Sequence, residues 1–308
     1  MGKTATREAY GKALAELIVK NPNVVVLDAD LTKSTKTADA KNACPERHFN
    51  MGIAEGNMIT TAAGIATSGK VVFASSFSIF ATGRAFEQIR NSICYPKLNV
   101  KICGTHAGIT VGEDGASHQA LEDIAIMRAI PNMVVIQPCD GKETEEVIKF
   151  VSEYVGPVYV RLGRSAVEDV HDDSYTFKLG KGEVLKHGKD IALIATGMMV
   201  QEALTAAKML QEEGIDVTVV NMPSIKPIDE ELVIELANKH SILYTLEEHN
   251  IIGGLGSAVC EVSAKYHPVK VERIGVEDTF GESGKPQELL DKYGLSARKI
   301  VEKIKQTM

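Results

Sequence analysis

The chain has 308 residues, of which 44% are hydrophobic and 24% are charged, and its formal net charge is -7. This composition is typical of a globular protein with one or two sizeable cores, and it excludes a disordered or low-complexity chain. The acidic balance argues against a nucleic-acid partner, because such binding requires a net basic face.

The cysteines and the N-terminal residues indicate the cellular compartment in which the protein is expected. Five widely spaced cysteines form no C-x-x-C pair, which favours free, mostly buried thiols over a zinc site or a dithiol redox pair. The first residues lack the apolar stretch of an export signal, and no run of roughly 18 apolar residues occurs. We therefore expect a cytoplasmic protein with no membrane partner.

Strand-like and helical patterns alternate through the first half of the chain. The first helical stripe contains Tyr10, Leu14 and Ile18, and similar stripes precede each later strand. The expected strands are residues 24–27, 71–74, 98–103, 133–136 and 157–161. Five apolar strands alternating with five helices predict a parallel sheet that is covered on both faces.

A second unit of the same class begins near residue 188. Its expected strands are residues 191–195, 217–220, 242–245 and 269–274, and its expected helices are 199–213, 229–239 and 255–265. The stretch between the units is polar and weakly periodic, so residues 166–187 are interpreted as a linker. The sequence therefore predicts an α/β protein with two consecutive doubly wound domains and mainly parallel sheets, residues 1–165 and 188–308.

Ligands of open parallel sheets bind outside the carboxyl ends of the strands. In the first domain those ends are followed by four loops, residues 28–34, 75–80, 104–118 and 162–164, and we expect these loops to converge on one crevice. The third loop contains two histidines, two acids and four glycines, which is too rich in glycine for a helix or a strand. This loop is therefore the first candidate for a part of the catalytic site.

A second candidate is Glu55, which lies at a loop-to-helix junction among small and apolar neighbours. An acid at a helix start often does no more than compensate the helix dipole. Likewise, a histidine in a glycine-rich loop is often a local hydrogen-bonding group. The two segments together nevertheless predict a catalytic site that is divided between two loops.

Three motifs occur in order at compatible spacing. They are Ile53-Ala-Glu55 with its upstream residues 47–50, Phe77-Ser-Ile-Phe80, and the segment Val-Gly-Glu-Asp-Gly-Ala-Ser-His-Gln at 111–119. Together they resemble transketolase, a thiamine-diphosphate enzyme. The similarity spans nearly the whole chain and corresponds to the pyrimidine-binding and C-terminal domains of that family.

The resemblance implies how the cofactor is bound. Glu55 matches the glutamate that hydrogen-bonds N1' of the aminopyrimidine and favours its imino tautomer. Phe77 and Phe80 match the aromatic residues that pack on this ring. The third aromatic position of some transketolases is Gly83 here, so the pocket is looser or is completed by a neighbouring subunit.

The resemblance also implies how substrate is bound. His106 and His118 match two histidines of the substrate channel and join Glu55 in the expected catalytic set. Asp114 matches the aspartate that recognises the C2 hydroxyl of the donor sugar. The sugar phosphate is expected to be held by three further residues, Arg7, Ser34 and Arg164. For Arg7, an ordinary surface ion pair is an equally good interpretation.

One part of the family's site is missing from the sequence. Transketolases hold the cofactor's diphosphate and a divalent metal such as Mg²⁺ with a Gly-Asp-Gly motif and a downstream Asn, in a domain that precedes the matched region. Cys139-Asp140-Gly141 departs from that motif, so no metal ligand is expected in this chain. The resemblance thus implies a split enzyme, in which an N-terminal partner subunit supplies this site in an α2β2 assembly.

The implied reaction is transfer of a two-carbon ketol unit between ketose and aldose phosphates, as in the pentose phosphate pathway. Two alternatives share the architecture: the beta subunit of a 2-oxo acid dehydrogenase and 1-deoxyxylulose-5-phosphate synthase. The motif at 111–119 favours transketolase over both. A third alternative, a non-catalytic assembly subunit, would not require the site residues.

Overall fold

A seven-stranded sheet forms the centre of the N-terminal unit in the computed structural model, which describes residues 2–308. Neighbouring strands follow the order β12-β6-β7-β5-β4-β2-β3, and all pairs are parallel except β12 with β6. The strands are β2 (Val24–Asp28), β3 (His48–Asn50), β4 (Val71–Phe77), β5 (Val100–Thr105), β6 (Val134–Ile136), β7 (Val158–Arg161) and β12 (Ser224–Lys226).

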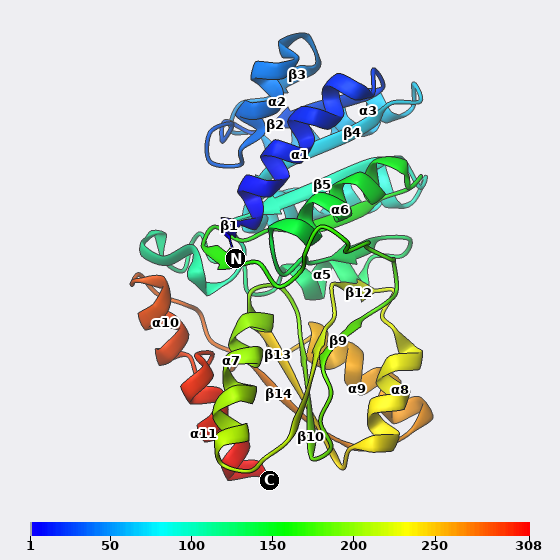
Figure 1. Ribbon diagram of the computed structural model, residues 1–308. Coiled ribbons are helices and arrows are strands. Elements are labelled where there is room, and N and C mark those ends of the chain that lie inside the picture. The colour runs from blue at the N-terminus through cyan, green and yellow to red at the C-terminus, as the bar shows by residue number, and fades with distance from the viewer. Residues whose placement is uncertain (1) are drawn as a thin grey trace.

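Helices cover both faces of this sheet, which explains why its strands are almost entirely apolar. One hydrophobic cluster packs α1 and α6 on one face, and a second packs α3 and α5 on the other. In Figure 1, α1 and α6 lie across the front of β4 and β5. The helices are α1 (Thr6–Lys20), α2 (Thr37–Ala43), α3 (Glu55–Ala66), α4 (Phe86–Gln88), α5 (Asp123–Ala129) and α6 (Gly141–Glu153).

The C-terminal unit has a five-stranded sheet of order β14-β13-β10-β11-β9, in which β9 is antiparallel to β11 and the other pairs are parallel. Its strands are β9 (Glu183–Lys186), β10 (Ile191–Ala195), β11 (Val217–Asn221), β13 (Ile242–Asn250) and β14 (Lys270–Val276). Helices α7 and α11 pack on one face, and α8 and α9 pack on the other. The helices are α7 (Met199–Glu212), α8 (Glu230–Lys239), α9 (Leu255–Tyr266), α10 (Pro286–Lys292) and α11 (Ala297–Thr307).

The predicted fold class is confirmed, and each predicted strand is present within a few residues of its expected ends. The sequence pattern did not reveal the short antiparallel strands. Two of them, β8 (Ala166–Glu168) and β9, lie inside the expected linker, where β8 pairs with β1 (Lys3–Ala5) and β9 pairs with β11. These strands have too few apolar residues for a periodic signal and depend on partners that are distant in sequence. The expected domain boundary therefore stays a prediction.

Two further observations concern the whole described chain. All five cysteines are free and four are buried, which confirms the expected free thiols. Among residues 2–308, no helix is both long enough and apolar enough to span a membrane.

A buried ion pair of the N-terminal unit also contacts the C-terminal unit. The Arg161 guanidinium, at the end of β7, donates from Nε and Nη2 to the two carboxylate oxygens of Asp123 at 2.7 and 3.1 Å. It also donates to the backbone oxygen of Glu248 in β13 at 3.0 Å. Burial alone would raise the pKa of Asp123, but the Arg161 charge holds it below its usual value. This pair fixes β7, α5 and β13 around one point.

Replacing Asp123 with Ala is expected to destabilise the protein by about 3–5 kcal/mol, because the Arg161 charge would stay buried without its partner. Urea unfolding followed by circular dichroism measures the loss. The control is Asp291→Ala, which breaks an exposed pair with Arg298 and should change the free energy of unfolding little. Equal losses in the two variants would contradict a structural role for the buried pair.

Candidate active site

Four aromatic rings meet where β4 and β5 end. The rings of Phe77 and Phe80 are nearly parallel, with centroids 5.9 Å apart, and the His106 ring stacks 3.8 Å from that of Phe77. The His118 ring lies edge-on to both phenylalanines, at centroid distances of 6.1 and 5.2 Å. The structure therefore brings together four of the predicted site residues, from two of the four loops that were expected to converge.

His106 occupies an unusual backbone position directly after β5. Its φ of 56° lies in the left-handed region, which non-glycine residues seldom adopt and which often marks a functional site. Arg7 Nη1 lies 3.2 Å from His106 Nε2, and Thr105 Oγ1 lies 2.9 Å from Nδ1. Because a guanidinium can only donate, Nε2 must be the acceptor, which leaves the proton of the neutral ring on Nδ1.

Burial and the nearby positive charges of Arg7 and Arg164 lower the pKa of His106 to about 3. The ring is therefore neutral at physiological pH. If the Arg7 guanidinium moves away, Nε2 can accept a hydrogen bond from another donor. The neutral ring cannot serve as a cationic acid.

The three residues expected to hold a phosphate are Arg7, Ser34 and Arg164, and Arg7 interacts with both of the others. Arg7 Nη1 donates to the backbone oxygen of Ser34 at 2.9 Å, so Ser34 contributes its carbonyl rather than its hydroxyl in this state. Arg164 donates to the backbone oxygen of Val111 and lies 3.5 Å from the Glu113 carboxylate. The Arg164 charge also contributes to the lowered pKa of Arg7, after burial and against the opposing effect of Glu8.

Asp114 is the predicted residue that stands apart. It ends the 3₁₀ segment Ile109–Asp114 and is exposed. Within residues 2–308 its side chain makes no hydrogen bond or ion pair with the other predicted residues. Its role in sugar recognition stays a prediction.

Glu55 begins α3, and its side chain is 3% exposed. Arg84 Nη1 lies 3.2 Å from both of its carboxylate oxygens, and Ser76 Oγ lies 3.5 Å from one of them. The Arg84 guanidinium carbon is also 4.2 Å from the centroid of the Phe80 ring. The sequence analysis missed Arg84. Its position four residues after Phe80 was the available signal, because that spacing places side chains on one face of a helical turn.

The C-terminal unit contacts the loop that follows β5. Glu248 Oε1 accepts a hydrogen bond from the Thr110 backbone N–H at 2.5 Å. Gly108 has a φ of +81°, and a Cβ there would lie 2.3 Å from the Glu248 carboxyl carbon. Gly108 is therefore needed both for the turn and for the close approach of Glu248.

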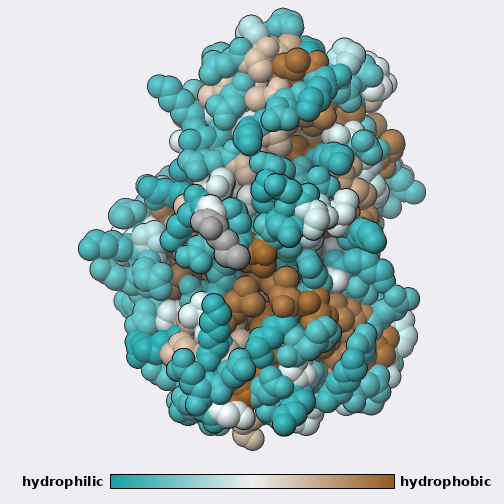
Figure 2. Space-filling model, viewed as in Figure 1, coloured by the Kyte–Doolittle hydropathy of each residue, from teal (hydrophilic) through white to brown (hydrophobic). Residues whose placement is uncertain are grey.

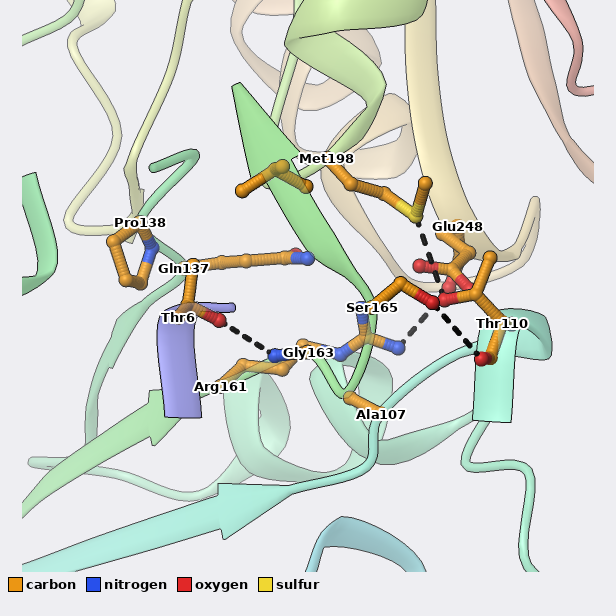
Figure 3. Close-up of a pocket in the computed structure, with 11 residues that line it drawn as sticks. Thr6, Ala107, Thr110, Gln137, Pro138, Arg161, Gly163, Ser165, Met198 and Glu248 are labelled. Atoms are coloured by element: carbon orange, nitrogen blue, oxygen red, sulfur yellow. Dashed lines mark hydrogen bonds between the residues drawn. The ribbon is translucent and has the colours of Figure 1, made fainter. Parts of the chain in front are cut away.

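Figure 3 shows the small cavity at this joint, with Glu248, Thr110 and Arg161 converging from different elements. Its volume of about 20 Å³ is enough for about one water molecule. Two buried atoms of lining residues, Arg161 Nη1 and Gln137 Oε1, have no hydrogen-bond partner. The cavity is lined by none of the nine predicted site residues, so it is part of the domain joint rather than of the candidate active site.

A possible metal cluster lies elsewhere. Ligand atoms of Cys139, Asp140 and His171 lie within 4.8 Å of one another. However, His171 Nδ1 is 2.9 Å from Asp140, and its Nε2 is 3.0 Å from Glu183. Burial alone would lower the pKa of His171, but these acids raise it to about 9. A protonated imidazole bonded at both nitrogens is not a metal ligand.

Comparison with known proteins identifies the family. Residues 2–169 match the family model described as "Transketolase, pyrimidine binding domain", and residues 180–300 match "Transketolase, C-terminal domain". The chain belongs to the transketolase family.

Several similar proteins match this chain over nearly their full length. A transketolase C-terminal section from Methanocaldococcus jannaschii is 55% identical, over 98% of this chain and 96% of that protein. A 6-deoxy-6-sulfo-D-fructose transketolase subunit from a Clostridium species is 40% identical, over 96% and 92% of the two chains. A solved split gene transketolase, an inactive beta4 tetramer, is 56% identical with a TM-score of 0.90, and the match covers 99% and 98%.

Transketolases depend on thiamine diphosphate, and the pyrimidine-binding domain is present here. The residues of this chain fit an aminopyrimidine. The Arg84 guanidinium, a flat group with N–H donors at its edge, already rests on Phe80 and donates to the buried Glu55 carboxylate. The same wall and the same acceptor would suit the face and the edge of a pyrimidine ring.

The neutral state of His106 predicts a pH effect on stability. Its pKa of about 3 in the folded state lies below the ordinary value of 6.5, so its contribution is present above pH 6.5 and is lost as the pH falls. Between pH 7 and 4.5 this loss should be roughly 2–3 kcal/mol. His106→Asn should therefore lose less stability than the wild type over this interval.

Denaturant unfolding at a series of pH values measures this effect. The control is His187→Asn, which changes an exposed histidine and should retain the wild-type pH dependence. If His106→Asn and the wild type lose stability equally on acidification, His106 is not held neutral by its surroundings.

Proposed function

We propose that this chain is the C-terminal subunit of a split transketolase, which transfers a two-carbon ketol unit between ketose and aldose phosphates, including those of the pentose phosphate pathway. The observation that carries the proposal is the buried carboxylate of Glu55, which Arg84 connects to the Phe80 ring, together with His106, which stacks on Phe77 and contacts Arg7. A purely structural subunit needs none of these groups. The beta subunit of a 2-oxo acid dehydrogenase would not need the motif at 111–119.

In this proposal each residue acts on a defined atom. When bound, thiamine diphosphate supplies the nucleophilic carbon that allows the ketose carbon–carbon bond to break. Glu55 holds a proton against N1' of the pyrimidine, and Phe77 and Phe80 form the flat wall on which the ring rests. His106 Nε2 accepts hydrogen bonds from sugar hydroxyls, and His118 lines the same wall.

The anionic end of the sugar binds near Arg7 and Arg164. After burial, the charge of Arg164 helps to lower the pKa of Arg7, and both charges lower the pKa of His106, so a tetrahedral anion between the two arginines would be stabilised. The carbonyl of Ser34 orients Arg7, and Asp114 turns towards the donor hydroxyl when substrate is present. A similar subunit is named for a sulfonated sugar, and a sulfonate has the same tetrahedral shape as a phosphate.

A partner chain completes the site. It is an N-terminal transketolase subunit that holds the diphosphate and a divalent metal such as Mg²⁺, and the expected assembly is α2β2. The solved split gene transketolase supports this proposal, because it is inactive as a beta4 tetramer. The cytoplasmic location stays a prediction.

The first test is reconstitution. This chain, purified from its native host, should bring down a protein that has Gly-Asp-Gly and a downstream Asn. The reconstituted complex should form sedoheptulose 7-phosphate from pentose phosphates and should not consume pyruvate. Pyruvate consumption would instead favour the dehydrogenase or 1-deoxyxylulose-5-phosphate synthase alternatives. Turnover of a sulfonated ketose but not of its phosphate counterpart would move the substrate away from the pentose phosphate pathway.

The second test is Glu55→Gln in that complex. We expect ketol transfer to fall by about 100-fold or more, because the amide cannot exchange a proton with N1'. The matched control is Glu212→Gln, an exposed acid on α7, which should keep the wild-type rate. Unchanged activity of Glu55→Gln at limiting thiamine diphosphate would contradict a catalytic role and favour an assembly subunit.

A further inference from the structure

Arg84 occupies the position that the proposed function assigns to the cofactor's pyrimidine ring. Its Nη1 lies 3.2 Å from each oxygen of the Glu55 carboxylate, and its guanidinium carbon lies 4.2 Å from the Phe80 centroid. A pyrimidine bound to the same carboxylate and stacked on the same ring would need this volume. Arg84 and the pyrimidine therefore cannot occupy the site together.

The two members of this ion pair differ greatly in their exposure. The Glu55 side chain is 3% exposed, whereas the Arg84 side chain is 51% exposed. Glu55 starts the 12-residue helix α3 and cannot leave without disturbing it. Arg84 ends the π-helical segment Phe80–Arg84 at the surface, so its flexible stem can carry the guanidinium into solvent. If a ligand separates the pair, Arg84 is the member that moves.

The carboxylate needs a replacement partner when Arg84 leaves. Apart from Arg84, its polar contact within residues 2–308 is Ser76 Oγ at 3.5 Å, the outer limit of a hydrogen bond. A buried carboxylate without a compensating donor is strongly unfavourable. The carboxyl group must therefore gain a proton or a new donor as the guanidinium departs, and in the proposed function the proton that Glu55 shares with N1' of the pyrimidine meets this need.

We propose that Arg84 is a positioning residue that closes the pyrimidine half-site in the cofactor-free chain and exchanges with the cofactor's ring during binding. This inference rests on the proposed function, because it assigns the competing ligand to the same carboxylate. It explains how a chain that lacks a diphosphate site keeps its catalytic acid paired before the partner and cofactor arrive. It also makes the affinity for the cofactor depend on Arg84, although Arg84 has left Glu55 once the cofactor is bound.

The test measures the dissociation constant of thiamine diphosphate in the reconstituted complex by isothermal titration calorimetry. Arg84→Met keeps an apolar stem over Phe80 but removes the competing cation, so we expect binding to be tighter by about tenfold or more. The matched control is Arg90→Met, an exposed arginine that contacts Asn91, which should keep the wild-type affinity. Thermal unfolding of each variant verifies that it is folded.

Two further measurements separate competition from other effects. In a Glu55→Gln background, Arg84→Met should change the affinity little, because the charged acceptor that holds the guanidinium is gone. In Arg84→Met alone, millimolar guanidinium chloride should weaken cofactor binding by refilling the vacated position. The same concentration of sodium chloride should have a smaller effect, and the wild type should respond equally to both salts.

The outcomes are distinct. Weaker or unchanged binding in Arg84→Met, together with weaker binding in Glu55→Gln, would overturn the exchange and leave the proposed function intact. Weaker binding would show that Arg84 holds the cofactor instead of competing with it. Absence of cofactor binding in the wild-type complex, or an unchanged affinity in Glu55→Gln, would overturn the proposed function and the exchange together.

Discussion

The arrangement of the site depends on the buried guanidinium of Arg161. It is bonded to Asp123 at the start of α5 and to the backbone of Glu248 in β13, so it fixes the second sheet relative to the first. Glu248 is thereby placed under the catalytic loop, where it accepts the Thr110 N–H. A contact between domains thus helps to determine the shape of a loop that carries candidate site residues of one domain. The C-terminal unit thereby supports this loop although it contributes no predicted site residue.

The electrostatics of the site follow from this placement. Burial of the loop brings His106 close to Arg7 and Arg164, and the same positive charges that would attract a sugar phosphate keep the imidazole neutral. A bound dianion would partly offset those charges, so the pKa of His106 should rise when substrate binds. The histidine therefore responds to the charge of the substrate rather than to physiological changes in pH.

The sequence predicted the longer parallel strands, but not the short β3, and it pointed to candidate site residues, because apolar strands and clustered motifs have local signals. Apolar runs mark the strands, and the loops after β4 and β5 contain phenylalanines and histidines at recognisable spacing. It did not predict β9 or β12, whose pairing is set by distant partners, nor the Glu248 support, which comes from a residue 138 positions after Thr110. The tautomer of His106 also depends on Arg7, 99 positions earlier. Contacts of this kind have no periodic or compositional trace.

In the proposed split enzyme, the pairing of Glu55 with Arg84 meets a constraint that division between two chains places on the half-site of this chain. A catalytic carboxylate that is buried for use with a cofactor is unfavourable until the cofactor arrives, and here the cofactor's tail is expected to be held by another chain. In a single-chain enzyme, folding and completion of the site are one event. In a divided enzyme the C-terminal chain must be stable first, so a temporary donor is an advantage. Arg84 suits this role because its flat guanidinium matches both the carboxylate and the Phe80 ring, while its 51% exposed side chain leaves it free to withdraw.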